Sequence, residues 1–136
     1  MADCIFCRIV AGQIPCAKLY EDEYVLGFLD INPINPGHSL VLPKRHYAVL
    51  TEVPDRELEA CIGAAKRVAR AVSRSVGSAG LNLLQNNGRA AGQLIEHVHF
   101  HLIPRDPGDG FLTSWPGKPY PSGQMEAVLE KIKAAL

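Results

Sequence analysis

The run His97-Val98-His99-Phe100-His101 places a histidine at every second position. Successive side chains of a β-strand point to opposite faces, so this spacing predicts a strand with imidazoles on one face and apolar side chains on the other. Neighbouring imidazoles on such a strand lie about 6.5–7 Å apart. Gathering them on one face carries a desolvation cost that core packing does not offset, so the run indicates a functional site.

The spacing alone leaves two kinds of site open. A metal can be bound by His-x-His on a strand, because neutral imidazole is the commonest metal ligand. Alternatively, one imidazole acts as a nucleophile or base while its neighbours donate to an anion. The preceding loop favours the anion, because Gly88 and Gly92 let backbone N–H groups approach it closely. Asn86 and Gln93 add amide donors suited to phosphate oxygens.

The size and charge of the chain restrict its class. Its 136 residues fit a single domain, 1–136. Lys plus Arg (14) balances Asp plus Glu (14), which argues against nucleic acid as the main partner. No apolar run is long enough to span a membrane, and residues 1–10 lack the features of a signal peptide. We therefore expect a cytoplasmic protein whose four cysteines stay reduced.

The pattern of apolar residues predicts one long helix and several short strands. Apolar side chains recur at helical spacing over residues 54–76, and Gly77 ends that run. Shorter helices are expected over 4–11 and 124–136. The strands are expected over residues 18–23, 24–30, 38–43, 81–87 and 97–103. Together they predict an α+β fold with a mainly antiparallel, five-stranded sheet, one long helix and one or two short ones.

The histidine run, followed by Leu102-Ile103, matches the His-x-His-x-His pattern and the two apolar residues of the histidine triad (HIT) family. Residues 28–31 (Phe-Leu-Asp-Ile), residues 37–44 and the upstream Asn86…Gly92-Gln93 fit the same family. Over about residues 4–111, the chain resembles the histidine triad nucleotide-binding proteins of bacteria.

The resemblance implies a HIT-like domain with its core over about 4–111 and a C-terminal tail over 112–136. It also implies a homodimer in which the helix over 54–76 and the strand over 81–87 pair with a second copy. The implied substrate is a purine nucleotide, either a nucleoside phosphoramidate or a dinucleoside polyphosphate. Hydrolysis or transfer at its α-phosphate would pass through a nucleotidyl-histidine intermediate and release a nucleoside monophosphate such as AMP.

The resemblance also implies roles for individual residues. It makes His99 the nucleophile and places His101 and His38 beside the α-phosphate. The nucleotide-binding residues it implies are Phe6, Phe28, Asp30, Ile31, Asn86, Gly92, Gln93, His99 and His101. Asp30 would accept from the ribose hydroxyls, and the apolar side chains would enclose the base. Asn86 and Gln93 would bind phosphate or orient His99. From the residues alone, Phe28 and Ile31 are equally consistent with core packing, and Asp30 with a turn residue.

Some family members share the pair Cys4-x-x-Cys7, and others lack these cysteines entirely. The resemblance therefore extends to a structural zinc ion bound by Cys4, Cys7, His46 and His97. Two thiolates and two imidazoles form the closed tetrahedral set that such a site requires. In one alternative, His46 is a surface residue that follows Lys44-Arg45. In another, the cysteine pair is a redox site, although it lacks the strand-then-helix context of a thioredoxin-like motif.

Two residues depart from the simplest expectation. Leu94 stands where the phosphoramidase and dinucleoside-polyphosphatase branches usually carry Ser or Thr, which predicts slow hydrolysis that favours good leaving groups. Trp115, in a Pro/Gly-rich tail, is expected either to approach the partner's site or to pack on its own subunit.

A nucleotide-binding module with little turnover, acting through protein partners, is the alternative function.

Overall fold

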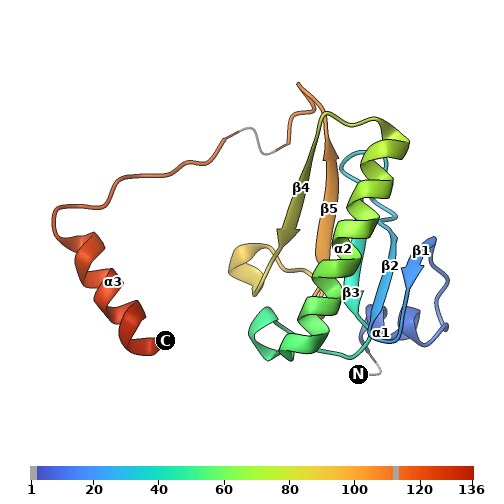
Figure 1. The fold of residues 1–136 in the computed structure, drawn as a ribbon, viewed down its shortest axis with the longest axis horizontal. Helices are drawn as coiled ribbons and strands as arrows, with labels where there is room; N and C mark the ends of the chain where they lie inside the picture. Colours follow the sequence, from blue (N-terminus) through green and yellow to red (C-terminus); the bar gives the residue numbers. More distant parts are fainter. Residues whose placement is uncertain (1–2, 112–113) are drawn as a thin grey trace.

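The computed structural model describes residues 3–111 and 114–136, and the predicted border between core and tail, at residue 112, lies outside them. The strands form one five-stranded sheet. A long helix, α2 (Asp55–Val76), lies across one of its faces (Figure 1). The short helix α1 (Ile5–Val10) packs on the opposite face. All neighbouring strands are antiparallel, which confirms the predicted α+β fold.

The sheet has the strand order β1-β2-β3-β5-β4. The strands are β1 (Lys18–Glu21), β2 (Val25–Leu29), β3 (Ser39–Pro43), β4 (Gly80–Gln85) and β5 (Phe100–Arg105). The first four differ from the predicted ranges by one or two residues at an end. The fifth begins three residues later than predicted, because the N–H of Val98 donates to the carbonyl of Tyr47 (2.8 Å) and residues 97–99 precede the strand ladder.

Helix α2 (Asp55–Val76) covers one face of the sheet and forms the main core with it. Its inward side chains Ala65, Val68 and Val72 are buried there with Val98 and Phe100 of the histidine run and with Leu102, which follows that run. Gly77 ends the helix in the left-handed conformation (φ +66°), as predicted. Cys61 is fully buried, and burial raises the pKa of its thiol to about 12, so it serves as an apolar core residue.

Helix α1 (Ile5–Val10) forms a second core on the other face of the sheet. Its Phe6 is buried with a group of strand residues, Leu26, Phe28, Leu40 and Leu42. Two single-turn 3₁₀ helices, η1 (Leu50–Glu52) and η2 (Arg89–Ala91), lie in the loops that follow β3 and β4. The face of the sheet opposite α2 is therefore framed by α1 and by the loop that contains η2.

Gly37 fixes the turn before β3. Its φ of +92° is rarely adopted by other residues, and an added Cβ would lie 3.0 Å from Val72 and 3.1 Å from Val76 of α2. Only glycine fits this close approach, which places His38 at the start of β3.

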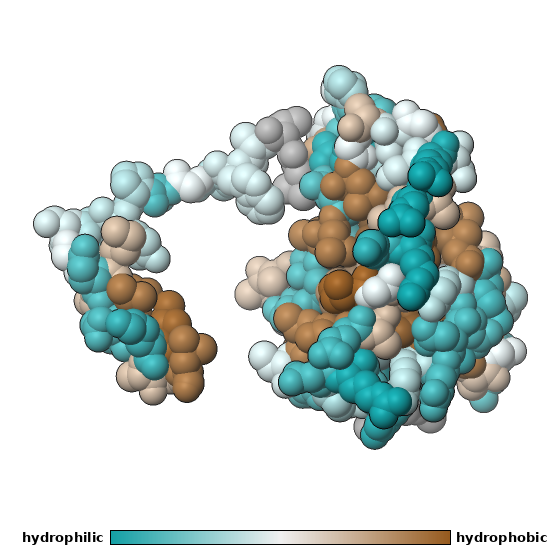
Figure 2. All heavy atoms as spheres, in the orientation of Figure 1, coloured by the Kyte–Doolittle hydropathy of each residue, from teal (hydrophilic) through white to brown (hydrophobic). Residues whose placement is uncertain are grey.

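Helix α3 (Gln124–Ala135) stands away from the sheet at the end of an extended segment (Figure 1). Figure 2 shows an apolar face along it, to which Met125, Leu129 and Ile132 contribute, each at least 50% exposed. Trp115 in the extended segment is 80% exposed, so packing on its own subunit does not bury it. Among the residues described, no helix has the length and apolar character needed to cross a membrane.

Candidate active site

A cavity of about 680 Å³ opens on the face of the sheet opposite α2, a size usual for small-molecule sites. The predicted residues that line it are Phe6, Phe28, Asp30, Ile31, His38, Asn86, Gly92, His99 and His101. They come from α1, the ends of three strands and the loop containing η2. The fold therefore brings together all the predicted catalytic and nucleotide-binding residues except Gln93.

His99 presents a free ring nitrogen to this cavity. Its Nδ1 lies 2.7 Å from the carbonyl oxygen of His97. A carbonyl only accepts, so Nδ1 carries the proton and Nε2 keeps its lone pair. Burial lowers the pKa of His99, which keeps the ring neutral at pH 7. The Phe6 ring packs edge-on against it, with 5.0 Å between ring centroids. This geometry suits a nucleophile.

His38 and His101 form a hydrogen-bonded pair with a defined proton order. The N–H of Ile34 donates to His38 Nδ1 (3.0 Å), so the neutral His38 carries its proton on Nε2. That proton is donated to His101 Nδ1 (2.9 Å), which leaves the His101 proton on Nε2. Burial lowers the pKa of both rings, that of His101 to about 4. At neutral pH, His101 is thus a neutral N–H donor beside His99.

Asp30 acts both in a turn and at the cavity. Its Oδ1 accepts from the N–H of Asn32 (2.8 Å), as expected for a residue that follows a strand. Its Oδ2 lies 3.6 Å from His38 Nε2, and the side chain lines the cavity. The turn role does not exclude the predicted one, because a carboxylate has capacity for further hydrogen bonds.

The sequence did not decide whether Phe28 and Ile31 pack in the core or line the site. In the structure the two residues differ in burial. Phe28 is both core and cavity wall: it is 5% exposed and packs edge-on against Phe6, with 5.8 Å between ring centroids. Ile31 is 89% exposed at the cavity, so its interpretation as a core residue is wrong.

Gln93 lies behind the cavity and holds the loop together. Its side chain is buried, and its Oε1 accepts from the N–H of Gly88 (2.7 Å). Its Nε2 donates to the carbonyls of Ala48 (2.7 Å) and Ile95 (3.1 Å). These bonds support the turn at Gly92, whose φ of +88° brings its backbone to the cavity wall.

Two further kinds of contribution to the site carry little or no signal in the sequence. The cavity is also lined by apolar side chains that include Ile5, Ile9, Leu40 and Leu84. Their spacing gives a partial signal, because Ile5 and Ile9 are four residues apart on one face of α1. The backbone groups that set the histidine protons, the N–H of Ile34 and the carbonyl of His97, carry no side-chain signal at all.

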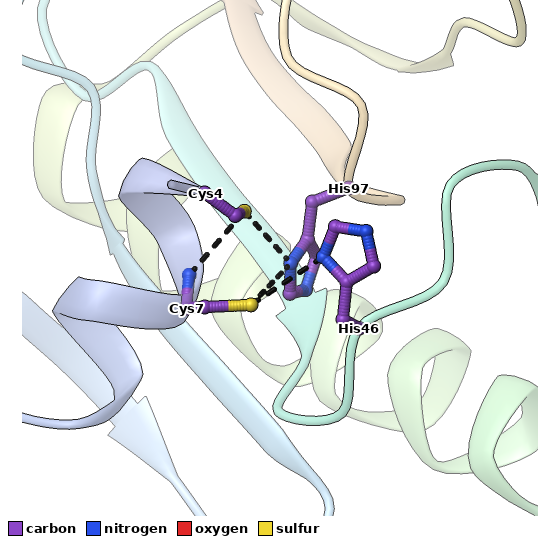
Figure 3. A group of neighbouring side chains, drawn as sticks. All are labelled: Cys4, Cys7, His46 and His97. Atoms are coloured by element: carbon purple, nitrogen blue, oxygen red, sulfur yellow. Dashed lines mark hydrogen bonds between the residues drawn. The ribbon is translucent and has the colours of Figure 1, made fainter. Parts of the chain in front are cut away.

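A second group of side chains, here called the metal cluster, consists of Cys4, Cys7, His46 and His97 (Figure 3). His97 Nδ1 lies 3.5 Å from Cys4 Sγ and 3.6 Å from Cys7 Sγ, and His46 Nδ1 lies 3.4 Å from Cys7 Sγ. In a tetrahedral zinc site, the usual bond lengths place sulfur and nitrogen ligands about 3.6 Å apart. The four donors therefore fit a zinc ion, and half-buried His46 is one of them.

The hydrogen bond behind His97 agrees with this fit. His97 Nε2–H donates to the carbonyl of Pro43 (2.7 Å), which leaves the Nδ1 lone pair facing the sulfurs. Metal-binding histidines usually donate their second N–H in this way.

Asp30, His38 and His101 also bring ligand atoms within 4.8 Å of one another, but they do not fit a metal. His38 Nδ1 already accepts the N–H of Ile34, so metal binding at Nε2 would require an imidazole with no proton. Of these two groups of described residues, only the metal cluster has the proton arrangement that coordination needs.

The chain is similar to the proteins of one known family. The HIT domain family model matches residues 11–108. An adenosine 5′-monophosphoramidase of Schizosaccharomyces pombe is 42% identical over 134 residues, which cover 98% of this chain and 98% of that protein.

Solved structures show the same fold. The crystal structure of a HIT family protein from Bacillus subtilis has a TM-score of 0.92 and 42% identity, and the match covers 98% of this chain and 97% of that one. The structure of a zinc-bound histidine triad protein from Mycobacterium smegmatis has a TM-score of 0.76 and 36% identity, covering 99% of each chain. The chain therefore belongs to the HIT family.

Proposed function

We propose that this protein is a nucleotide hydrolase or transferase that acts at the α-phosphate of nucleoside phosphoramidates or dinucleoside polyphosphates. It releases a nucleoside monophosphate such as AMP. The observation that carries the proposal is the free Nε2 of His99 inside the cavity, fixed by the bond from Nδ1–H to the His97 carbonyl. The name of the S. pombe relative supports an adenosine nucleotide as substrate.

The reaction has two displacements at phosphorus. His99 Nε2 bonds to the α-phosphorus, the bond to the leaving group breaks, and a neighbouring donor protonates that group. Water then bonds to phosphorus, the N–P bond breaks, and the proton of the water is released. His101 Nε2–H and backbone N–H groups near Gly92 stabilise the charge on the phosphoryl oxygens.

The substitution His99→Ala tests this mechanism. Losing the nucleophile should lower kcat/KM for adenosine 5′-phosphoramidate by several orders of magnitude. AMP affinity, measured by calorimetry, should change little. A variant that retains more than about a tenth of the activity has lost under ~1.4 kcal/mol of transition-state stabilisation, which contradicts the role of His99.

The same variant separates the enzyme from a binding module with little turnover. If wild-type protein binds AMP but hydrolyses no phosphoramidate or dinucleoside polyphosphate, the module is the better description. Detection of a nucleotidyl group on wild-type protein by mass spectrometry, and its absence from His99→Ala, would exclude the module.

We infer that the metal cluster holds a structural zinc ion. Cys4, Cys7, His46 and His97 would fill all four positions of a tetrahedral ion, which would tie α1 to the segment before β5 and leave no position for water. A cytoplasmic location, where thiols stay reduced, keeps both cysteines available.

We also infer that the protein acts as a homodimer. Strand β4 is an edge of the sheet and carries Leu83, which is 51% exposed. The apolar face of α3 also stays uncovered within one chain (Figure 2). Pairing with a second copy would cover both surfaces. Light scattering at micromolar concentration should give twice the mass of one chain, and a monomeric mass would contradict the dimer.

A further inference from the structure

We propose that the metal cluster shapes the wall of the nucleotide cavity, so that metal binding and nucleotide binding strengthen each other. In this arrangement Phe6 is the positioning residue that connects the two sites. The proposal rests on the proposed function, because it requires a nucleotide in the cavity. Two structural connections support it.

The first connection is the Cys4-x-x-Cys7 segment itself. The two residues between the cysteines, Ile5 and Phe6, both line the cavity. Phe6 is 4% exposed, and its ring packs against Phe28 and His99. Fixing both sulfurs on one ion therefore fixes two residues of the cavity wall.

Helix α1 depends on this anchor because it is short. It has six residues, and helices of that length are unstable without tertiary contacts. Its N-cap is Cys4, whose Sγ accepts from the N–H of Cys7 (3.5 Å). The cysteine that begins the helix is thus also a ligand of the cluster. The other anchors of α1 are the apolar contacts of Phe6, Ile9 and Val10 in the second core.

The second connection is the segment 97–99. His97 contributes its ring to the cluster, and its carbonyl holds His99 Nδ1–H at 2.7 Å. The Phe6 ring touches both histidines, at centroid distances of 5.9 Å from His97 and 5.0 Å from His99. Because this segment precedes the strand ladder of β5, a ligand bond at His97 would be a direct restraint on the position of His99.

These connections predict a reciprocal effect between the two sites. A bound metal holds Phe6 and His99 in the positions that a nucleotide contacts. A bound nucleotide packs on Phe6 and in turn holds α1, with both cysteines, in the position that the metal needs. The two affinities must change by the same factor, and couplings of this kind are commonly 5- to 150-fold.

The experiment compares AMP binding to zinc-loaded and chelator-stripped full-length protein by calorimetry, with circular dichroism to verify that both forms are folded. We expect AMP to bind the stripped form about tenfold more weakly. The reciprocal measurement needs only loaded protein: saturating AMP should lower the transfer of zinc to a competing chelator at equilibrium by the same factor. If the stripped protein unfolds, this second measurement tests the coupling between zinc and AMP binding by itself.

A matched pair of variants tests the route through Phe6. Phe6→Leu should reduce the ratio of the two AMP affinities toward one, whereas Phe28→Leu should weaken AMP binding in both forms and keep the ratio. Equal AMP affinity in both forms, with zinc transfer unaffected by AMP, would overturn the coupling and leave the proposed function intact. AMP that binds neither form would overturn the proposed function and the coupling with it.

Discussion

The metal cluster and the His38–His101 pair use the same side chain with opposite proton arrangements. In the metal cluster, His97 donates an N–H to the carbonyl of Pro43 and turns a lone pair to the sulfurs. In the pair, His38 accepts an N–H from Ile34 and passes its own proton toward His101. The nature of the backbone partner, carbonyl or amide, therefore decides whether a histidine offers a lone pair or a proton.

His99 connects the two regions. It follows the rule of the metal cluster, because the carbonyl of His97 accepts its Nδ1–H and leaves Nε2 as a lone pair. Yet that lone pair faces the cavity beside His101, which offers a proton. A lone pair and an N–H donor thus lie side by side in neutral rings, which suits the proposed attack on a phosphorus whose oxygens gain charge.

Removing a cluster ligand should have the largest effect on stability. For Cys7→Ser we expect zinc to fall from about one to well under one per chain. The free energy of unfolding should fall by about 4 kcal/mol in buffer that holds free zinc at roughly a thousand times its Kd. Elemental analysis of protein purified without chelator, and denaturant unfolding, measure the two effects.

Cys16→Ser is the matched control, because Cys16 is a half-buried cysteine outside the metal cluster. It should keep its zinc. Wild-type protein with well under one zinc per chain would refute the site, as would equal zinc loss in both variants.

Removing His38 should reduce catalysis without touching the metal. In His38→Ala, His101 Nδ1 loses its donor, and its proton is no longer held on Nε2. His101 would then no longer reliably donate Nε2–H to the charged phosphoryl oxygens. A hydrogen bond to a charged group contributes about 1.5–3 kcal/mol, so kcat/KM should fall about 10- to 150-fold. Zinc content should stay at the wild-type value, whereas His46→Ala should lose zinc. Zinc loss in His38→Ala would show that the His38–His101 pair binds metal. It would contradict the distinction between a metal-binding cluster and a proton-donating pair.

The response to acid provides a third test. Burial, with the neighbouring His99 and His38 adding to it, holds the pKa of His101 at about 4, below its ordinary value of 6.5. The unfolded chain therefore takes up a proton between pH 6.5 and 4 that the folded protein resists. Stability present above pH 6.5 should be lost progressively as the pH falls toward 4. The NMR signals of His101 should keep their neutral positions from pH 7.5 to 5.5, and a midpoint near 6.5 would contradict this.

The order of the elements could be predicted from the sequence because their signals are local. The period of α2 and its end at Gly77 belong to one short stretch, and so does the alternation around His99. That alternation overstated the strand, since residues 97–99 precede the sheet ladder and the N–H of Val98 donates to the carbonyl of Tyr47. Alternation reports side-chain direction, not which backbone group is the hydrogen-bond partner.

The proton order of the site could not be predicted, because it depends on contacts between distant parts of the chain. The carbonyl of Pro43 lies 54 positions from His97, and the carbonyl of Ala48 lies 45 from Gln93. The amide side chain of Gln93 predicted a phosphate ligand. In the structure, its three hydrogen bonds instead stabilise the loop that contains η2. The position of α3 away from the sheet likewise had no local signal.

Leu94 lies between the two regions compared above. It lines the cavity that contains His99 and also a smaller pocket of about 510 Å³ that Cys4 and His46 border. The side chain is 85% exposed in the loop before β5, so ordinary strand packing does not explain it. A leucine there offers no hydrogen bond to an atom that leaves phosphorus.

Leu94→Ser would place a hydroxyl at that position and should give the smallest of these effects. A new hydrogen bond to a charged leaving atom contributes about 1.5 kcal/mol at the low end, where an exposed site belongs, so turnover should rise about tenfold. The gain should appear for adenosine phosphoramidates with poorly leaving amines and nearly vanish for good leaving groups, which need little help with their charge. Leu94→Ala removes the side chain without adding a hydroxyl and serves as the control. An equal gain in both variants would assign the effect to side-chain size, and no change in either would leave Leu94 without a part in substrate choice.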